Sequence, residues 1–228
     1  MSIECHVFRQ APYDRILEIQ TAEFEKRVEC RKTGLSLPDD VIFFVEHLPV
    51  LTLGKHGNSE NLVVDKVSLE ARGIGLFHIG RGGDITYHGP GQLTVYPIID
   101  LIRYRMGVRE YVSLLEEAVI LTIKDYGIEG KRIEGATGVW IGDAPGERKI
   151  SAIGVRCSRS VTMHGLALNI GRDLSGFSLI NPCGFKDKGV TSISNETGEV
   201  VDFEEVVEKL KENLIRLLLQ RIPSPENF

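Results

Sequence analysis

Three segments with helical periodicity enclose a series of short strand-like runs, and this alternation limits the folds that the chain can adopt. The helices are expected over residues 13–33, 109–126 and 203–221. Strands are expected in the β-branched and aromatic runs bounded by Gly or Pro, at residues 41–48, 50–54, 75–80, 92–101, 137–142, 149–157 and 164–170. Strands interrupted by single helices, with one helix near each end, predict an α+β fold.

The second and third helical segments carry clear end signals. Residues 109–126 form an amphipathic stripe that stops at Gly127, a residue type that commonly ends helices. Residues 203–221 follow Asp202, an expected N-cap, and Glu205 completes a capping-box-like pattern. No repeat, linker or low-complexity stretch divides the sequence, so we expect a single domain over all 228 residues.

The composition is that of an ordinary globular protein. Of its 228 residues, 42% are apolar and 26% charged, which is enough to bury one sizeable core. A net charge of −5 gives no general attraction to nucleic acid or anionic membranes. No run approaches the roughly 20 apolar residues that span a bilayer, and the N-terminus has no secretion-signal pattern. We expect a soluble, cytoplasmic monomer without nucleic-acid or membrane partners.

Glycine is concentrated around the stretch RGGDITYHGPGQ, residues 81–92. Seven of the 24 glycines lie between Gly73 and Gly91, and this density lets backbone approach a ligand closely. The stretch matches neither a Walker loop nor a dinucleotide-binding GxGxxG motif. We predict a loop whose N–H groups at Gly82 and Gly83 line a small-molecule pocket.

Polar side chains accompany the glycines and a later apolar run. Arg81, Tyr87 and His88 belong to the glycine-rich stretch, and His88 is either a site residue or a hydrogen-bonded core histidine in a glycine hairpin. His164 precedes an apolar run and is either a supporting donor or a structural residue. Asn169 could cap the end of that strand.

The four cysteines are widely spaced and form no CxxC pair. A disulfide in a reducing compartment and a zinc site are therefore not expected. Each cysteine is either a small buried residue or a reactive thiol. Cys5 is placed on a first strand near the N-terminus, Cys30 in the helix 13–33 and Cys157 in the strand 149–157. Cys183 lies instead in the loop-like motif NPCG, where we expect exposed backbone and a functional site.

Lys149 begins the predicted strand KISAIGVRC. On a regular strand it would share a face with Ser151, Ile153 and Val155, where partial desolvation would lower its pKa and let it accept a proton. The alternative is a strand-end lysine whose ammonium reaches water. Cys157 lies eight positions along the same strand, about 26 Å at 3.3 Å per residue, which is too far to be the partner of this lysine.

Four motifs occur in the order RGGDITYHGPGQLTVYPIIDL, KISAIGVR, HGLALNI and NPCG. Together they resemble the lipoyl(octanoyl) transferase family, over roughly residues 41–194. The resemblance implies a mixed sheet flanked by helices, like the catalytic domains of biotin and lipoate protein ligases. It also implies transfer of an octanoyl group from acyl carrier protein to a lysine of a lipoyl domain, with no cofactor and no metal.

The resemblance also implies roles for individual residues. The acyl-thioester cysteine of the family falls on Cys183, and the lysine that tunes that thiol falls on Lys149. The substrate-binding positions fall on Arg81, Gly82, Gly83, Asp84, Ile85, Thr86, Tyr87, His88, Ala152, Ile153, Gly154, Gly165, Leu166 and Ala167. The implied partners are acyl carrier protein as donor, with lipoyl domains of 2-oxoacid dehydrogenases and the glycine cleavage H protein as acceptors.

Three other functions stay open. An ATP-dependent lipoate-protein ligase of the same fold would activate its acid as an adenylate and need no cysteine nucleophile. A non-catalytic module that holds a lipoyl domain or an acyl chain would not need Cys183 for its activity. A Cys–His hydrolase is the third alternative, although no protease signature surrounds that cysteine.

Basic side chains outnumber acidic ones in residues 147–159. The basic residues are Arg148, Lys149, Arg156 and Arg159, and the acidic residue is Glu147. Because acyl carrier proteins are usually acidic, we predict that this segment, together with Lys186 and Lys188, forms a basic surface facing the carrier. An ordinary solvated face is the alternative.

Two features depart from the family pattern. The polar loop GDAPGERK precedes the strand of Lys149, and Ser160 stands where a bulky aromatic residue is expected. Both bear on the fit of the substrate more than on the type of reaction.

Overall fold

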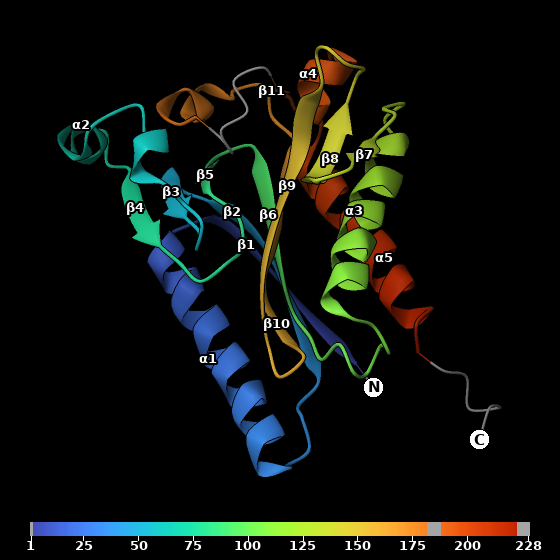
Figure 1. The fold of residues 1–228 in the computed structure, drawn as a ribbon. Coiled ribbons are helices and arrows are strands. Elements are labelled where there is room, and N and C mark those ends of the chain that lie inside the picture. Colours follow the sequence, from blue (N-terminus) through green and yellow to red (C-terminus); the bar gives the residue numbers. More distant parts are fainter. Residues whose placement is uncertain (1, 182–187, 223–228) are drawn as a thin grey trace.

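The computed structural model describes residues 2–181 and 188–222. Within this part of the chain, eight strands form a mixed sheet in the order β1-β2-β6-β10-β9-β8-β7, with β11 pairing with β9 (Figure 1). The strands are β1 (Ile3–Ala11), β2 (Asp40–His47), β6 (Gln92–Ile98), β7 (Lys131–Ile133), β8 (Ala136–Ile141), β9 (Arg148–Ser158), β10 (Val161–Asn169) and β11 (Gly189–Val190). The β1–β2 and β9–β11 pairs are parallel and the other pairs antiparallel. The predicted α+β fold with a mixed sheet is confirmed.

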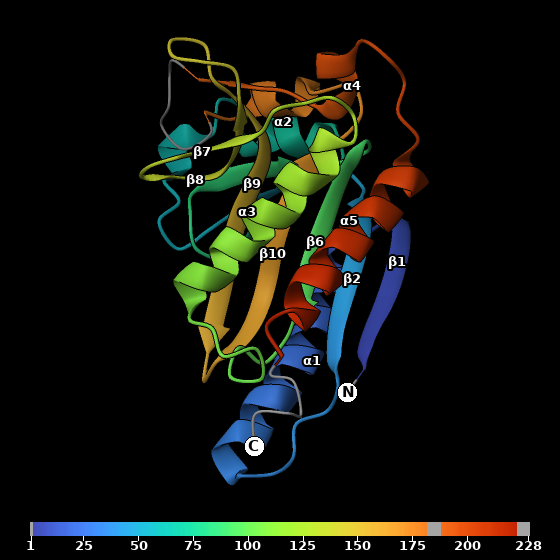
Figure 2. The ribbon, with the colours of Figure 1, turned by 90° about the vertical axis from the view of Figure 1, so that its right-hand side faces the viewer.

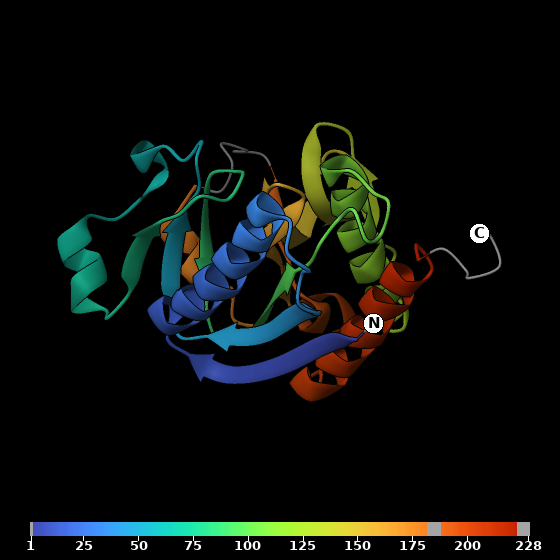
Figure 3. The ribbon, with the colours of Figure 1, turned by 90° about the horizontal axis from the view of Figure 1, so that it is seen from below.

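Helices cover both faces of this sheet. α1 (Tyr13–Thr33) packs on one face against β6 and β10, while α3 (Val108–Lys124) and α5 (Phe203–Leu219) lie side by side on the other (Figures 2 and 3). All three predicted helices are confirmed, the last two ending two residues earlier than expected. Asp202 caps α5 by accepting a hydrogen bond from the Glu205 N–H at 3.0 Å.

A second, three-stranded sheet lies beside the first, in the order β4-β3-β5. Its strands are β3 (Val50–Leu53), β4 (Gly75–His78) and β5 (Ile85–His88), and the short helices α2 (Lys66–Ala71), η1 (Ser59–Asn61) and η2 (Ser175–Leu179) adjoin it. The stretch 81–92, predicted to be a loop, therefore contains a strand. Its central residues pair with β3, and Ile85 is buried in a small core of its own with Leu51 and Leu179. The remaining helix, α4 (Ile193–Thr197), follows β11.

β9 contains one extra residue beside β8, and this residue decides where Lys149 points. Trp140 pairs with Lys149 whereas Val139 pairs with Ser151, so Ile150 is the extra residue of a β-bulge. Val139 and Ile150 are both buried in the core beneath α3 and α5. Lys149, opposite Trp140, therefore lies on the other face of the sheet.

The prediction that Lys149 shares a face with Ser151, Ile153 and Val155 is wrong for this reason. One inserted residue reverses the alternation of side chains beyond it. Ile153 and Val155 pack against the core beneath α3 and α5, as does Cys157. Cys157 is half-buried, and burial raises the pKa of its thiol.

Candidate active site

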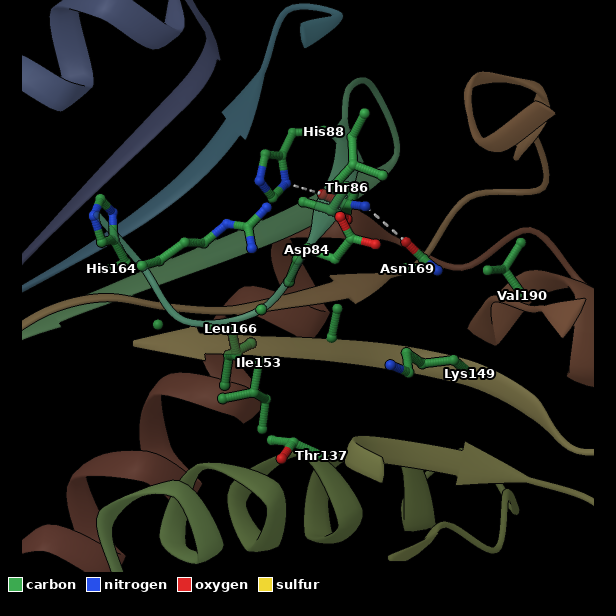
Figure 4. Close-up of a pocket in the computed structure, with 18 of the residues that line it drawn as sticks. Asp84, Thr86, His88, Thr137, Lys149, Ile153, His164, Leu166, Asn169 and Val190 are labelled. Atoms are coloured by element: carbon green, nitrogen blue, oxygen red, sulfur yellow. Dashed lines mark hydrogen bonds between the residues drawn. The ribbon is translucent and has the colours of Figure 1, made fainter. Parts of the chain in front are cut away.

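A cavity of about 400 Å³ lies where the small sheet meets β9 and β10 (Figure 4). Its walls come from β5 and the loop before it, from β8, β9 and β10, and from residues 188–190. Segments far apart in the sequence thus converge here. The positions predicted from the sequence that line the cavity are Arg81, Gly83, Asp84, Ile85, Thr86, His88, Lys149, Ala152, Ile153, Gly154, His164, Gly165, Leu166, Ala167 and Asn169.

Two predicted substrate-binding residues are not part of this lining. Gly82 donates its N–H to the carbonyl oxygen of Val155 at 2.9 Å and so joins the loop to β9. Tyr87 packs edge-on against Phe177, with ring centroids 5.7 Å apart. Because side chains alternate along β5, His88 faces the cavity and Tyr87 does not.

Two glycines allow backbones to approach closely around the cavity. A Cβ on Gly165 would lie 2.1 Å from the Val95 carbonyl oxygen, and one on Gly154 would lie 2.8 Å from the Gly82 carbonyl oxygen. The resemblance placed Gly154 among the substrate-binding positions, and Gly154 does line the cavity. In the structure it leaves room for the backbone of the glycine-rich loop, which lies directly over β9.

A chain of side-chain amides crosses one wall of the cavity. His88 Nδ1 lies 2.6 Å from Gln92 Oε1, and Gln92 Nε2 donates to Asn169 Oδ1 at 2.9 Å. Asn169 Nδ2 in turn donates to the Thr191 carbonyl oxygen at 2.9 Å. The Thr191 N–H then donates to the Lys149 carbonyl oxygen at 3.0 Å. Asn169 therefore joins β10 to the segment after β11, a larger role than the predicted strand-end cap.

One end of the cavity is built from buried histidines around a guanidinium group. Arg81 donates through Nη2 to the carbonyl and hydroxyl oxygens of Thr52 and through Nη1 to the Gly82 carbonyl oxygen. Burial lowers the pKa of His88 to about 3 and that of His164 to about 3, so both rings are neutral at physiological pH. Within the described residues, Nδ1 of His164 has no hydrogen-bond partner.

Figure 4 shows Lys149 on the opposite side of the cavity from His164. Its Nζ lies 4.6 Å from the ring centroid of Trp140, close enough for a cation–π interaction. Nζ of Lys188 lies 5.4 Å from the same centroid and 2.9 Å from Glu147 Oε2. The Nζ atoms of two lysines therefore lie near one indole ring at this end of the cavity.

Cys183 and Lys186 lie outside the described residues. Before these residues, Asn181 donates its N–H to the Asn61 carbonyl oxygen at 2.8 Å, and after them Gly189 donates to the Glu147 carbonyl oxygen at 3.2 Å. Residues 188–190 line the cavity together with Lys149.

The basic residues of segment 147–159 are spread along β9 and just beyond it, and their contact with the carrier stays a prediction. Arg148 forms a two-pronged contact with Glu196, at 3.0 and 2.9 Å, and Lys188 pairs with Glu147. Arg148 and Arg156 are eight positions apart on β9, about 26 Å along a strand. The guanidinium of Arg156 stacks over Phe24 of α1 at 4.8 Å. The sequence alone could not reveal that Glu196, 48 positions further along the chain, pairs with Arg148.

Comparison with known proteins identifies the family. Residues 21–215 match the model of the lipoyl protein ligase A/B catalytic domain. The chain belongs to this family. It is 53% identical over 205 residues to an octanoyltransferase of Parabacteroides distasonis, covering 89% of this chain and 92% of the relative. It is 50% identical over 211 residues to an octanoyltransferase of Bacteroides fragilis, covering 92% and 95% of the two chains. The resemblance to the lipoyl(octanoyl) transferase family is confirmed.

Solved structures share the fold of this lipoyl protein ligase A/B family member. A bipartite lipoate protein ligase of Thermoplasma acidophilum matches with a TM-score of 0.69 at 17% identity, covering 96% of this chain and 85% of that one. A biotin protein ligase of Aquifex aeolicus matches with a TM-score of 0.51 at 11% identity, covering 97% and 72%. These likenesses confirm the ligase-like fold predicted from the motifs.

Several residues that line the cavity were not predicted from the sequence to do so. Tyr13, Gln92, Tyr96, Trp140 and Lys188 all line the cavity. Gln92 could have been predicted from the sequence, because it ends the glycine-rich stretch, and it is the first residue of β6. Nothing in the local sequence shows that Tyr13 of α1 and Trp140 of β8 face the cavity. The packing of α1 and the strand order around β8 place them there.

Across residues 2–181 and 188–222, no helix is both long and apolar enough to cross a membrane. Over the same ranges, no cluster of three or more His, Cys, Asp or Glu side chains is arranged to hold a metal ion.

Proposed function

We propose that this chain transfers an octanoyl group from octanoyl-acyl carrier protein to a lysine of lipoyl domains, through a thioester on Cys183. The family match and the relatives named octanoyltransferase support the overall reaction. The observation that carries the proposal is the composition of the cavity wall. Lys149 lies there beside residues 188–190, the segment that follows Cys183 in the chain.

In the first half-reaction the Cys183 thiol gives its proton to the neutral amine of Lys149. The thiolate attacks the carbonyl carbon of the donor thioester, because a thiolate is the best protein nucleophile for this exchange. The tetrahedral intermediate collapses and breaks the bond to the carrier sulfur. The carrier thiolate takes the proton back from the Lys149 ammonium, which leaves an octanoyl thioester on Cys183.

In the second half-reaction the acceptor lysine attacks that thioester as a neutral amine. Its nitrogen loses a proton to Lys149, which again acts as the base. The carbon–sulfur bond breaks, an amide forms, and the Cys183 thiolate recovers the proton from Lys149. The balance needs no nucleotide, metal or redox partner.

Apolar side chains between the two ends of the cavity would hold the acyl chain. Ala152 and Ala167, which pair across β9 and β10, line the cavity on the same face of the sheet as Lys149. Burial of a methylene group contributes about 0.8 kcal/mol, so a longer chain gains affinity until the cavity is filled.

The acceptors we propose are the lipoyl domains of 2-oxoacid dehydrogenases and the glycine cleavage H protein. The donor is acyl carrier protein. The reaction places a flexible thioester arm and a lysine side chain at the same cavity in turn, so the two partners use its entrance one after the other.

The second candidate is an ATP-dependent lipoate-protein ligase. The fold favours it as an alternative, because solved neighbours include a lipoate-protein ligase A bound with ATP, with a TM-score of 0.69 at 15% identity. A ligase requires ATP and free acid. The transferase requires only the acylated carrier and the acceptor.

Intact mass spectrometry separates the two candidates. The wild-type protein is incubated with octanoyl-acyl carrier protein without ATP, alongside Cys183→Ser, Lys149→Ala and the control Cys157→Ser. We expect an octanoyl adduct on the wild type and the control, none on Cys183→Ser, and acylation slowed about 10²–10⁴-fold in Lys149→Ala. An adduct that persists in Cys183→Ser, or activity that depends on ATP and free acid, would overturn the proposal.

A further inference from the structure

We propose that Asp84 is a positioning residue for the segment that carries Cys183, and not a substrate-binding residue. The inference rests on the proposed role of Cys183 as the acyl-carrying nucleophile. Asp84 belongs to the RGGD motif and lines the cavity, which by itself suggests contact with substrate. The hydrogen bonds of its carboxylate point to a different task.

Both oxygens of the Asp84 carboxylate are taken by one turn of the chain. Oδ1 accepts the N–H of Asn58 at 3.1 Å, and Oδ2 accepts from the side-chain amide Nδ2 of Asn61. Charge-assisted hydrogen bonds of this kind are roughly twice as strong as neutral ones. The carboxylate is therefore committed to fixing residues 58–61.

The turn of residues 58–61 and the residues just after it bind residues 179–181, the chain just before the nucleophile. The carbonyl oxygen of Asn61 accepts the N–H of Asn181 at 2.8 Å, and Val63 donates to the Leu179 carbonyl oxygen at 2.9 Å. A β-bridge between Leu62 and Ile180 lies between these two bonds. Asn181 is two residues from Cys183 in the sequence, so the turn sets where the NPCG motif begins.

A second carboxylate fixes the chain after the motif. Glu147 pairs with Lys188 at 2.9 Å, its carbonyl oxygen accepts the N–H of Gly189, and β11 adds to the edge of β9 with Val190 opposite Lys149. The polar loop before β9, whose role was open at the sequence level, thus supplies this contact. The chain from residue 188 onward is thus joined to the strand of Lys149, and the chain up to residue 181 is held by the turn that Asp84 contacts.

The consequence is a specific kinetic signature. Loss of a substrate contact raises KM, whereas loss of nucleophile placement lowers the acylation rate at saturating donor. Misplacement of a reacting group by about 1 Å can cost about 10²-fold in rate. We expect Asp84→Ala to slow acylation of Cys183 about tenfold to a hundredfold, with KM for the octanoyl carrier changed less than about twofold.

An exchanged pair provides a direct test of the Asp84–Asn61 contact. Asp84→Asn leaves two amide groups facing each other, and combination with Asn61→Asp restores a carboxylate opposite an amide with the roles reversed. The amide oxygen at position 84 can still accept the Asn58 N–H. We expect Asp84→Asn to lose acylation rate and the double variant to recover most of it, an outcome that a substrate-binding role would not give.

The first assay measures acylation of the full chain by octanoyl carrier protein. The second measures alkylation of Cys183 by iodoacetamide as a function of pH, without substrate. Peptide mass is the readout of both. Asp65→Ala is the matched control, because Asp65 caps α2 in the same region by accepting the Ser68 N–H at 2.7 Å. We expect the alkylation profile of Asp84→Ala to change and that of Asp65→Ala to stay unchanged. Thermal melting checks that each variant is folded.

The outcomes separate failure of this inference from failure of the proposed function. If the wild type forms no adduct on Cys183, the proposed function fails. If the wild type is acylated but Asp84→Ala changes only KM, with the alkylation profile unchanged and no rescue by the exchanged pair, Asp84 is a substrate-binding residue and the inference is wrong.

Discussion

Nδ1 of His88 lies 2.6 Å from Oε1 of Gln92, and this contact fixes which nitrogen of the imidazole carries the proton. The Thr191 carbonyl can only accept, so Asn169 turns Nδ2 toward it and Oδ1 toward Gln92. Gln92 Nε2 must then donate to Asn169, and its second hydrogen goes to the Tyr87 carbonyl oxygen at 3.1 Å. Gln92 Oε1 is left as the acceptor, so His88 carries its proton on Nδ1 and presents Nε2 as an acceptor.

We therefore expect His88 to be the neutral Nδ1–H tautomer from pH 5 to pH 8. Burial lowers its pKa to about 3, so no titration falls in that range. Nitrogen-15 NMR of the histidine rings measures both the tautomer and the titration. Gln92→Glu places a carboxylate against Nδ1 and should raise the pKa of His88. An Nε2–H tautomer, or a wild-type titration near pH 6, would contradict the assigned hydrogen-bond chain.

The buried histidines also predict loss of stability in acid. The pKa of His164 is about 3 in the folded protein and about 6.5 in the unfolded chain. Above pH 6.5 both states are neutral and the ring has no effect on the pH dependence. Below it the unfolded chain binds a proton that the folded protein does not, so stability falls by about 1.4 kcal/mol per pH unit for each such histidine.

His164→Asn tests this pH dependence, because Asn tolerates the positive φ of 60° at this position. We expect the free energy of unfolding in urea to fall less between pH 7 and pH 5 in the variant than in the wild type. Equal pH slopes for the two proteins would show that His164 is not buried in its neutral form.

Close backbone contacts around the cavity predict a graded effect of adding single methyl groups. Gly165→Ala brings a Cβ within 2.1 Å of backbone, and Gly154→Ala within 2.8 Å, whereas Gly107→Ala meets nothing closer than 3.8 Å. We expect destabilisation of about 1–3 kcal/mol or more for the first two, with Gly165→Ala the worse, and little change for Gly107→Ala. Urea denaturation gives the order, and an equal effect at all three sites would be inconsistent with these contacts.

The dispersal of the basic residues predicts that the far end of β9 plays no part in carrier binding. Arg156 and Arg159 lie toward or beyond the end of β9 opposite to Lys149. Arg159→Glu and Arg156→Glu should leave KM for octanoyl-acyl carrier protein within about twofold of the wild-type value, because exposed charges separated by more than about 10 Å are largely screened at 0.1 M salt. A large rise in KM for either variant would instead support the basic surface predicted from the sequence.

Local signals in the sequence were enough to place the three long helices, α1, α3 and α5. α1 begins after Pro12 and ends at Gly34, whose φ of 73° is the left-handed conformation that glycine adopts easily. Asp202 caps α5 as its spacing to Glu205 predicted. Such features depend on neighbours a few residues away, so the sequence carries them directly.

The parts of the site that sequence reasoning missed depend on distant neighbours. The orientation of Lys149 reverses because β8 pairs with β9 through a bulge, and no strand-like run shows an inserted residue. Arg148 is neutralised by Glu196, 48 positions further along the chain. Motif resemblance found most of the lining, but it did not distinguish residues that contact substrate from residues that support the site.

The most direct measurement of the central claim is a single-turnover transfer from the isolated acyl-enzyme. The wild-type protein is loaded with octanoyl-acyl carrier protein, freed of the carrier, and mixed with a lipoyl domain in the absence of ATP. We predict that the octanoyl adduct leaves Cys183 at the rate at which octanoyl-lysine appears on the domain, and that no adduct can be loaded on Cys183→Ser. An adduct that stays on the enzyme while the domain remains unmodified would contradict the thioester mechanism.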